Sequence, residues 1–162
     1  MKKVGIVMGS DSDLPVIQKA TDLLKKLEIP FEVHVYSAHR TPEQARAFAV
    51  SARENGFGVL IAAAGMAAHL AGAIAANTTL PVIGIPCKGP VLDGMDALLS
   101  TVQMPSGIPV ASVGINNGAN AALLAAEILS VEDPDLAARL QQKRNQDTAA
   151  VLEKDAGIMT RL

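Results

Sequence analysis

Short apolar runs alternate in this chain with longer segments whose apolar residues recur every three or four positions, and this alternation limits the fold more than any other feature. The run at residues 4–8 is too short for a helix and stops at Gly9, which is typical of a strand buried on both faces. The next segment places Leu14, Ile17 and Leu24 on one helical face. Strands that alternate with helices in this way require a parallel sheet joined by right-handed crossovers.

The same signals repeat along the chain and predict five strands and six helices. The expected strands cover residues 4–8, 31–36, 59–63, 81–85 and 109–115. The expected helices cover residues 14–27, 42–55, 67–77, 93–102, 117–130 and, as a charged amphipathic segment, 134–153. We therefore expect one domain, residues 1–162, with a three-layer α/β/α architecture. Its doubly wound parallel sheet is expected to have the flavodoxin-like strand order 2-1-3-4-5.

Local signals set the expected ends of the first two helices. Either Ser12 or Asp13 can cap the first helix. The sequence Thr41-Pro42-Glu43-Gln44 is a capping box with proline at the first helical position, so a second helix is expected to begin at Pro42. Gly56 is expected to stop it.

Two of the predicted helices, around residues 67–76 and 119–126, are rich in alanine and glycine. Such small side chains let backbones approach closely. Burial against a second subunit and tight packing on the chain's own sheet both explain this composition, and both remain open at this stage.

Composition argues against several classes of function. The formal net charge is −2, and the four aromatic residues are one Tyr and three Phe, so neither the charge nor the stacking surface needed for nucleic acid is present. Cys87 is the only cysteine, and the three histidines show no metal-ligand spacing, so we expect no metal. The chain contains no run of about 18 apolar residues, so the sequence predicts no membrane span. We expect a cytoplasmic protein.

Ligands of open parallel sheets bind beyond the carboxyl ends of the strands, where the strand order reverses. In the predicted order, three loops meet there, at residues 9–13, 37–41 and 64–69. The first loop places Ser10 and Ser12 at a helix N-terminus, where both can donate to a phosphate. The alternative is that these residues only cap the helix. Asp11 and Asp13 do not favour phosphate, so one of them is expected to accept hydrogen bonds from sugar hydroxyls.

The other two loops carry the remaining candidates. Arg40 suits bidentate phosphate binding, and His39 can transfer a proton near neutral pH. Neither residue is needed for packing at that position, although both can equally be solvated loop residues. His69 follows a glycine-rich turn that starts at Gly65, so it either faces the same crevice or bonds to nearby backbone. Cys87 is expected to be a small buried side chain rather than a nucleophile.

Four motifs in this order closely resemble those of the class I 5-(carboxyamino)imidazole ribonucleotide mutases of bacterial purine biosynthesis. They are Gly9-Ser10-Asp11-Ser12-Asp13, Ser37-Ala38-His39-Arg40-Thr41-Pro42, Ala67-Ala68-His69-Leu70 and Val102-Gln103-Met104-Pro105. The resemblance extends from about residue 4 to residue 129. It implies an isomerase, free of cofactor and metal, that moves a carboxylate from the exocyclic nitrogen of an aminoimidazole ribonucleotide to ring carbon 4. It also implies a homo-octamer with its sites between subunits.

The resemblance further implies a role for each of eight residues. The residues that would hold the phosphate are Ser10, Ser12, Ser37 and Arg40. Asp13 would bind the ribose hydroxyls, and His39 would carry the proton. The carboxylate would lie in a pocket lined by Gly65 and His69. Carbon dioxide would be released and recaptured in a pocket of small residues at 63–67, which has to exclude water. His39 would move one proton in each direction.

Two positions depart from the typical family pattern Gly-Gly-Ala-Ala-His-Leu-Pro-Gly at residues 65–72, and the stretch at residues 86–90 also differs. Met66 adds bulk beside the pocket, Ala71 replaces the proline, and Lys88 adds a positive charge near the site. These departures bear on the shape of the pocket more than on the reaction.

Two rival functions remain open. A class II carboxylase would take carbon dioxide directly, but its Ser-Asn-Gly-Leu type of loop differs from residues 67–70 of this chain. A non-enzymatic receiver or flavin-binding module has the same fold. A receiver needs an aspartate where residues 62–65 read Ala-Ala-Ala-Gly, and a flavin site needs aromatic residues that the three loops lack.

Overall fold

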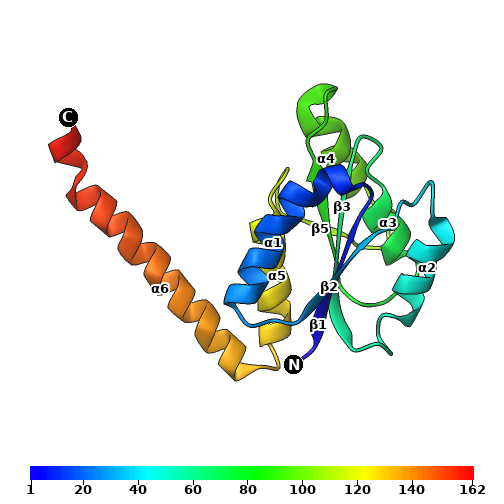
Figure 1. Ribbon diagram of the computed structural model, residues 1–162, viewed down its shortest axis with the longest axis horizontal. Helices are drawn as coiled ribbons and strands as arrows, with labels where there is room; N and C mark the ends of the chain where they lie inside the picture. The colour runs from blue at the N-terminus through cyan, green and yellow to red at the C-terminus, as the bar shows by residue number, and fades with distance from the viewer.

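A five-stranded parallel sheet forms the centre of the molecule (Figure 1). In the computed structural model, which describes all 162 residues, the strand order is β2-β1-β3-β4-β5. The strands are β1 (Lys3–Met8), β2 (Phe31–Val35), β3 (Phe57–Gly65), β4 (Val82–Cys87) and β5 (Ala111–Ser112). All four neighbouring pairs are parallel. The predicted fold class and strand order are therefore confirmed.

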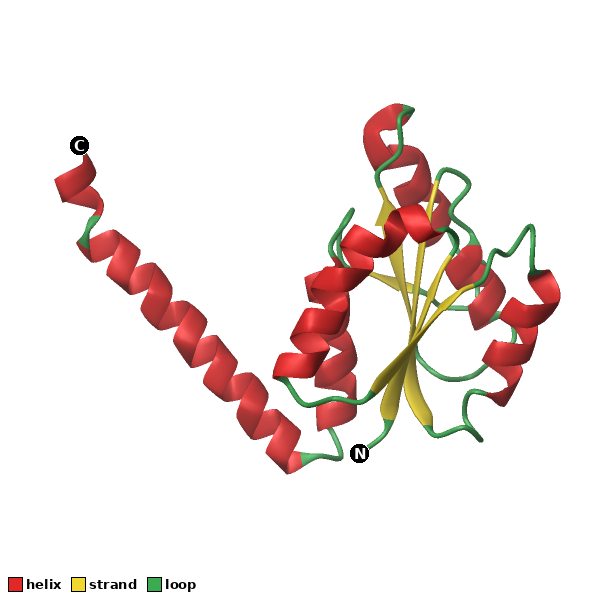
Figure 2. Cartoon of the chain, in the orientation of Figure 1, coloured by secondary structure: helices red, strands yellow, loops and turns green.

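Helices cover both faces of the sheet and complete three layers (Figure 2). On one face lie α1 (Leu14–Lys26) and α5 (Gly118–Ser130), and on the other lie α2 (Pro42–Ser51) and α3 (Leu70–Ala75). A further helix, α4 (Met95–Val102), packs against β4 and α3. Three short 3-10 helices lie at Asp11–Asp13, Leu92–Gly94 and Ile158–Arg161. None of the helices combines the length and the apolar character that crossing a membrane requires.

The central strands are apolar on both faces because helices cover both. In β1, Val4 and Ile6 pack in the core beneath α1 and α5, whereas Val7 packs in the core beneath α2 and α3. In β3, Ile61 and Leu60 divide in the same way. All five side chains have no exposed surface, and each such burial contributes roughly 1.5–3 kcal/mol. The continuous apolar runs in the sequence follow from this arrangement.

Helix α5 lies unusually close to α1. A Cβ atom built on Gly118 would lie 2.1 Å from the carbonyl oxygen of Val16, so only glycine fits at this contact. Farther along α5, Ala121, Ala122 and Ala125 are fully buried within the chain. The alanine-rich composition of α5 is therefore explained by tight packing on its own sheet, without a second subunit.

The last helix, α6 (Pro134–Ala156), contacts the rest of the chain only near its start. Leu136 and Leu140 are buried, and the Nε of Arg139 donates to the Leu27 carbonyl at 3.1 Å. Arg144 forms an ion pair with Glu127 of α5. Beyond this contact the helix runs away from the sheet (Figure 1). The end of α6 and the 3-10 helix after it carry exposed large apolar side chains, namely Val151, Leu152, Ile158, Met159 and Leu162.

The predicted starts of the first two helices, at Leu14 and Pro42, are confirmed, but their predicted caps are wrong. The Oγ1 of Thr41 accepts from the backbone N–H of Ser37 at 2.8 Å and does not cap α2. Helix α2 also ends at Ser51, four residues before the predicted limit, although Gly56 does adopt a left-handed φ of 82°. The first helix is preceded by a 3-10 turn that Ser10 caps, so neither Ser12 nor Asp13 caps α1 through its side chain.

Two other elements are shorter than predicted. Helix α3 begins at Leu70 rather than at residue 67, because Met66 has a left-handed φ of 56° and tight turns follow it. Strand β5 has two residues instead of seven. It pairs only with β4, lies at the edge of the sheet, and is followed by Gly114 with a φ of 117°. An edge strand with one partner has few ladder bonds to extend it.

Candidate functional site

The loops after β1, β2 and β3 lie side by side at the carboxyl edge of the sheet, as predicted. The Gly9 N–H donates to the Ala63 carbonyl at 3.0 Å and so joins the first loop to β3. The Nη2 of Arg40 donates to the Gly9 carbonyl at 3.3 Å and joins the second loop to the first. The structure thus brings Arg40 to the start of the serine loop, although the two are 31 residues apart in the sequence.

The first loop gathers hydroxyl groups at the start of a helical segment. The Oγ of Ser10 accepts from the Ser12 N–H at 3.3 Å and from the Ser12 hydroxyl at 2.9 Å. Both serines lie at the N-terminal end of the 3-10 turn that leads into α1, where backbone N–H groups favour an anion. The capping interpretation is correct for Ser10, which caps that turn. It gives no role to the exposed side chain of Ser12.

Asp13 is half-buried and does not cap α1. Desolvation by burial raises the pKa of its carboxyl group, the charge of Asp11 adds to this effect, and hydrogen bonds from Cys87 and Ser10 oppose it. A partly desolvated carboxylate that no helix terminus uses is suited to accept hydrogen bonds from a ligand. Asp13 therefore differs in kind from the exposed Asp11.

Cys87 lies beneath this loop at the end of β4 and is 3% exposed. Burial, together with the neighbouring charge of Asp13, raises the pKa of the Cys87 thiol to about 12. The thiolate form is therefore disfavoured at neutral pH, and the interpretation of Cys87 as a buried, unreactive side chain is supported.

The second loop is organised by Ser37. Its Oγ accepts from the backbone N–H groups of His39 at 3.3 Å and of Arg40 at 3.2 Å. Because both bonds use the oxygen as acceptor, the Ser37 hydroxyl proton remains available to a ligand. The imidazole of His39 is exposed and makes no hydrogen bond within the chain, so it is free to meet a substrate.

In the third loop, Gly65 allows close approach of the neighbouring strand. A Cβ atom at this position would lie 3.3 Å from the Cys87 carbonyl oxygen. Met66 follows with 63% of its surface exposed, so its bulk points away from the core. His69 is exposed, and its Nδ1 lies 3.3 Å from the Ser100 carbonyl oxygen in α4. The expectation of a bond between His69 and nearby backbone is correct.

Sequence analysis missed the partners of Lys88, which lie in the connection from β4 to α4 and in the loop after β5. The Lys88 N–H donates to the Asn116 side chain at 2.8 Å, and the Lys88 ammonium pairs with Asp93 at 2.6 Å. The ammonium group expected to add a positive charge near the site is therefore paired with a carboxylate at the surface. No sequence pattern marks these partners: Asp93 lies five residues farther along the same connection, and Asn116 lies in the loop after β5.

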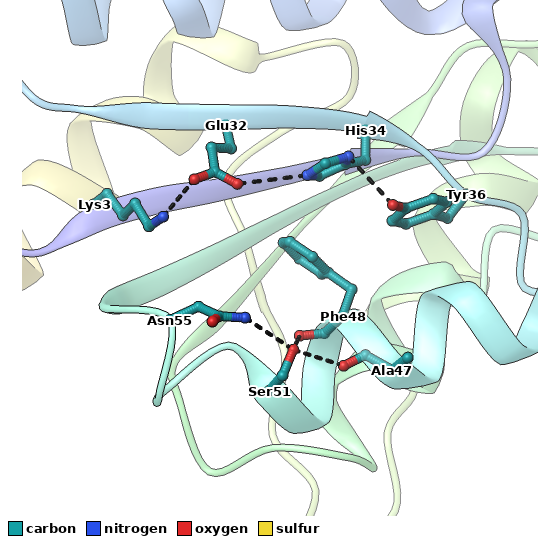
Figure 3. Close-up of polar contacts among 8 residues, drawn as sticks. All are labelled: Lys3, Glu32, His34, Tyr36, Ala47, Phe48, Ser51 and Asn55. Atoms are coloured by element: carbon teal, nitrogen blue, oxygen red, sulfur yellow. Dashed lines mark hydrogen bonds and ion pairs between the residues drawn. The ribbon is translucent and has the colours of Figure 1, made fainter.

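The third histidine belongs to a separate cluster (Figure 3). The Nε2 of His34 lies 3.7 Å from Glu32, its Nδ1 lies 3.3 Å from the Tyr36 hydroxyl, and its ring stacks on Tyr36. This cluster lines a cavity of about 530 Å³ between β2 and α2, where Phe48 also contacts the stack. Two larger cavities, of about 890 and 960 Å³, include none of the candidate residues.

The fold and its loops define a flavodoxin-like α/β protein that gathers hydroxyl, backbone N–H and guanidinium donors at the carboxyl edge of its parallel sheet. A family model described as AIR carboxylase matches residues 3–150. The chain belongs to this family.

Similar proteins match over most of the chain. The N5-carboxyaminoimidazole ribonucleotide mutase of Pyrococcus abyssi is 56% identical over 144 residues, which cover 89% of this chain and 83% of that protein. The Bacillus subtilis protein of the same name is 53% identical, with 93% and 94% covered. The phosphoribosylaminoimidazole carboxylase of Saccharomyces cerevisiae is also 53% identical, but the match covers 93% of this chain and 26% of the yeast protein.

The solved structures agree with the fold. The crystal structure of Treponema denticola PurE superposes with a TM-score of 0.84 at 29% identity, covering 94% of this chain and 96% of that one. The agreement extends over nearly the full length of both chains.

Proposed function

We propose that this protein is an isomerase of purine biosynthesis that converts N5-carboxyaminoimidazole ribonucleotide into 4-carboxy-5-aminoimidazole ribonucleotide. One observation carries the proposal: relatives named as this mutase are 53–56% identical and are matched over 83–94% of their own length. All three site loops lie within the matched region. The proposed substrate is a soluble ribonucleotide, and the single unpaired cysteine suits a reducing compartment, so we place the protein in the cytoplasm.

The 5′-phosphate is proposed to bind between the first two loops. Ser10 and Ser12 supply hydroxyls at the start of the helical segment, and Ser37 has a free hydroxyl proton. Arg40, whose Nη2 contacts Gly9, supplies the positive charge next to them. Arg40→Ala is therefore expected to raise KM more than it lowers kcat.

The ribose is proposed to bind at Asp13. Its carboxylate accepts hydrogen bonds, lies at the same loop as the phosphate-binding serines, and is not used as a helix cap. Two ribose hydroxyls would replace the water that its partial burial removes, which supports this assignment over the exposed Asp11.

His39 is proposed to carry the proton. When the bond between the exocyclic nitrogen and the carboxylate breaks, carbon dioxide leaves and the nitrogen takes a proton from His39. Ring carbon 4 then attacks carbon dioxide, and His39 takes back the proton that carbon 4 releases, so the protein returns to its starting state. The carboxylate is proposed to lie in the pocket beside Gly65 and His69. The free imidazole next to the phosphate-binding residues supports this role.

We further propose a homo-octamer with sites between subunits. The unpartnered end of α6 and the exposed row Leu92, Met95, Leu99 and Val102 on and before α4 are the surfaces that an assembly would cover. Light scattering coupled to size-exclusion chromatography tests this, and a monodisperse monomer at micromolar concentration would refute it.

The main alternative is a carboxylase that uses aminoimidazole ribonucleotide and carbon dioxide directly. It is favoured by the yeast relative, which is named as a carboxylase and is as similar as the Bacillus subtilis mutase. Sequence identity alone therefore does not separate the two reactions.

A two-substrate assay separates them. Purified protein, without ATP or added metal, is given freshly made N5-carboxyaminoimidazole ribonucleotide or, separately, aminoimidazole ribonucleotide with bicarbonate, and the absorbance of the product is followed. Rapid product formation from the first substrate, and not from the second, supports the mutase. Rapid product from the second at modest bicarbonate supports the carboxylase, and no product from either refutes both.

The His39→Asn variant tests the proton carrier. We expect this variant to fold and to bind the ribonucleotide but to lose turnover, because asparagine keeps a similar shape without exchanging a proton. A variant that turns over at nearly the normal rate would refute the assignment.

A further inference from the structure

Helix α4 is bonded to the turn that carries His69 at two successive residues. The Ser100 carbonyl faces the Nδ1 of His69 at 3.3 Å, and the Thr101 hydroxyl faces the Ala68 carbonyl at 3.2 Å. One contact therefore fixes the ring and the other fixes the backbone next to it. Both come from the same turn of one helix, so α4 holds the His69 turn at two adjacent points.

The contact with Ser100 determines which ring nitrogen of neutral His69 carries the proton. A backbone carbonyl only accepts hydrogen bonds, so Nδ1 has to be the donor and Nε2 keeps its lone pair. The ring also lies close to Gly72, because a Cβ atom built there would be 2.3 Å from Cε1 and 2.5 Å from Nε2 of His69. Nε2 is thus the one ring nitrogen left for a ligand.

The side chain of Thr101 is buried at this contact and takes part in it directly. Its side chain is almost completely buried, with 3% exposed, and its Cγ2 lies 2.4 Å from where a Cβ on Gly84 would be. Its hydroxyl has one proton and two acceptors, the Ala97 carbonyl at 2.8 Å within α4 and the Ala68 carbonyl at 3.2 Å outside it. No other group of the chain donates to the Ala68 carbonyl.

We propose that Thr101 is a positioning residue for the reaction. Its hydroxyl holds the Ala68–His69 turn against α4. The Ser100 carbonyl then fixes the His69 ring with Nδ1 protonated and Nε2 available to the substrate. The inference rests on the proposed function for its effect on turnover. The state of the His69 ring, in contrast, is a property of the free protein.

Three variants test the inference. Thr101→Val keeps the shape of the side chain and removes the hydroxyl, and Thr101→Ser keeps the hydroxyl. The matched control is Thr21→Val in α1, where another threonine with 9% exposure bonds only to the Gln18 carbonyl of its own helix. Each variant is checked for an unchanged oligomeric state and melting temperature before kinetics.

We expect Thr101→Val to lower kcat by about five- to tenfold, the effect of one lost neutral hydrogen bond, with a smaller change in KM. Thr101→Ser is expected to restore kcat to within about twofold of wild type, and Thr21→Val to leave it unchanged. A Thr101→Val enzyme with wild-type kcat, or equal losses in Thr101→Val and Thr101→Ser, would overturn the proposal.

The second readout is 15N NMR of protein labelled at histidine, with the His69 signals identified by their loss in His69→Gln. Wild type is expected to show neutral His69 with a protonated Nδ1 and a bare Nε2, and Thr101→Val to show a mixture of both forms. A bare Nδ1 in wild type, or identical spectra for wild type and Thr101→Val, would overturn the proposal. If wild type turns over neither substrate, the proposed function fails, and the ring state alone decides the inference.

Discussion

Replacing Gly72 by alanine is expected to displace the His69 ring without unfolding the protein. The new Cβ would lie 2.3 Å from Cε1, whereas ordinary contacts are 3.4–4 Å, so the ring has to move by at least about 1.1 Å (3.4 minus 2.3). The ring is the exposed end of a side chain, so it yields before the buried α3 backbone does. Movement on this scale also breaks the 3.3 Å contact with the Ser100 carbonyl.

Stability and activity should therefore separate in Gly72→Ala. Alanine in a helix is more favourable than glycine by about 0.5–1 kcal/mol, and the lost hydrogen bond costs about 0.5–1.5 kcal/mol, so the two effects nearly cancel. The melting temperature is expected to change by no more than about 3 °C. A misplacement of about 1 Å near the chemistry can cost roughly 100-fold, so kcat/KM is expected to fall by about 10- to 100-fold.

The assay is kcat/KM with N5-carboxyaminoimidazole ribonucleotide, together with thermal unfolding, for Gly72→Ala, His69→Ala and the double variant. If the alanine acts through the ring, it has no further effect once His69 is removed. The reasoning is refuted if Gly72→Ala keeps wild-type kcat/KM, or if the two losses add in the double variant.

Three further predictions concern stability and reactivity. Gly118→Ala places a Cβ 2.1 Å from the backbone oxygen of Val16, which cannot move aside. We therefore expect the free energy of unfolding, measured in urea, to fall by about 3 kcal/mol or more, and an unchanged midpoint would contradict this. Asp13 has a raised pKa, so its contribution to stability is present below the unfolded pKa of about 3.8 and is lost as pH rises through the folded value. Asp13→Asn is therefore expected to melt higher than wild type at pH 7, with the gap closing as the pH falls, and to bind substrate more weakly; equal melting at pH 7 would contradict the reasoning. Cys87, with a pKa of about 12, is expected to resist a thiol reagent at pH 8 until denaturant is added, and rapid labelling of the native protein would be the opposite result.

The sheet and the meeting of the three loops were predictable because they depend on patterns that are local in the sequence. The apolar run at residues 4–8 alternates between two buried faces, so Val4 and Val7 had to lie under different helices. Once the strand order was inferred, the loops holding Ser10 and Arg40 had to be neighbours, and the 3.3 Å bond from Arg40 to Gly9 confirms it.

The features that could not be predicted depend on competing local bonds or on partners that no sequence pattern marks. Thr41 has the pattern of a helix cap, but the Ser37 N–H, four residues earlier, competes successfully for its oxygen. The partner of His69 is a backbone carbonyl, which every residue carries, so no side-chain pattern marks Ser100. Thr101 likewise looks like an ordinary helix residue until the fold brings Ala68 to it.

The open site of the single chain bears directly on the proposed chemistry. A reaction that releases and recaptures carbon dioxide has to keep the gas from escaping and water from entering. Yet Ser12, His39, Arg40 and His69 are all exposed in the chain by itself. The chain supplies the floor of the site through the buried ends of β1, β3 and β4, but it supplies no cover. The end of α6 has the opposite character, since it has apolar side chains and nothing within the chain to contact. An uncovered site and an unpartnered helix on the same molecule have a common explanation in the proposed assembly, where subunits close what each leaves open.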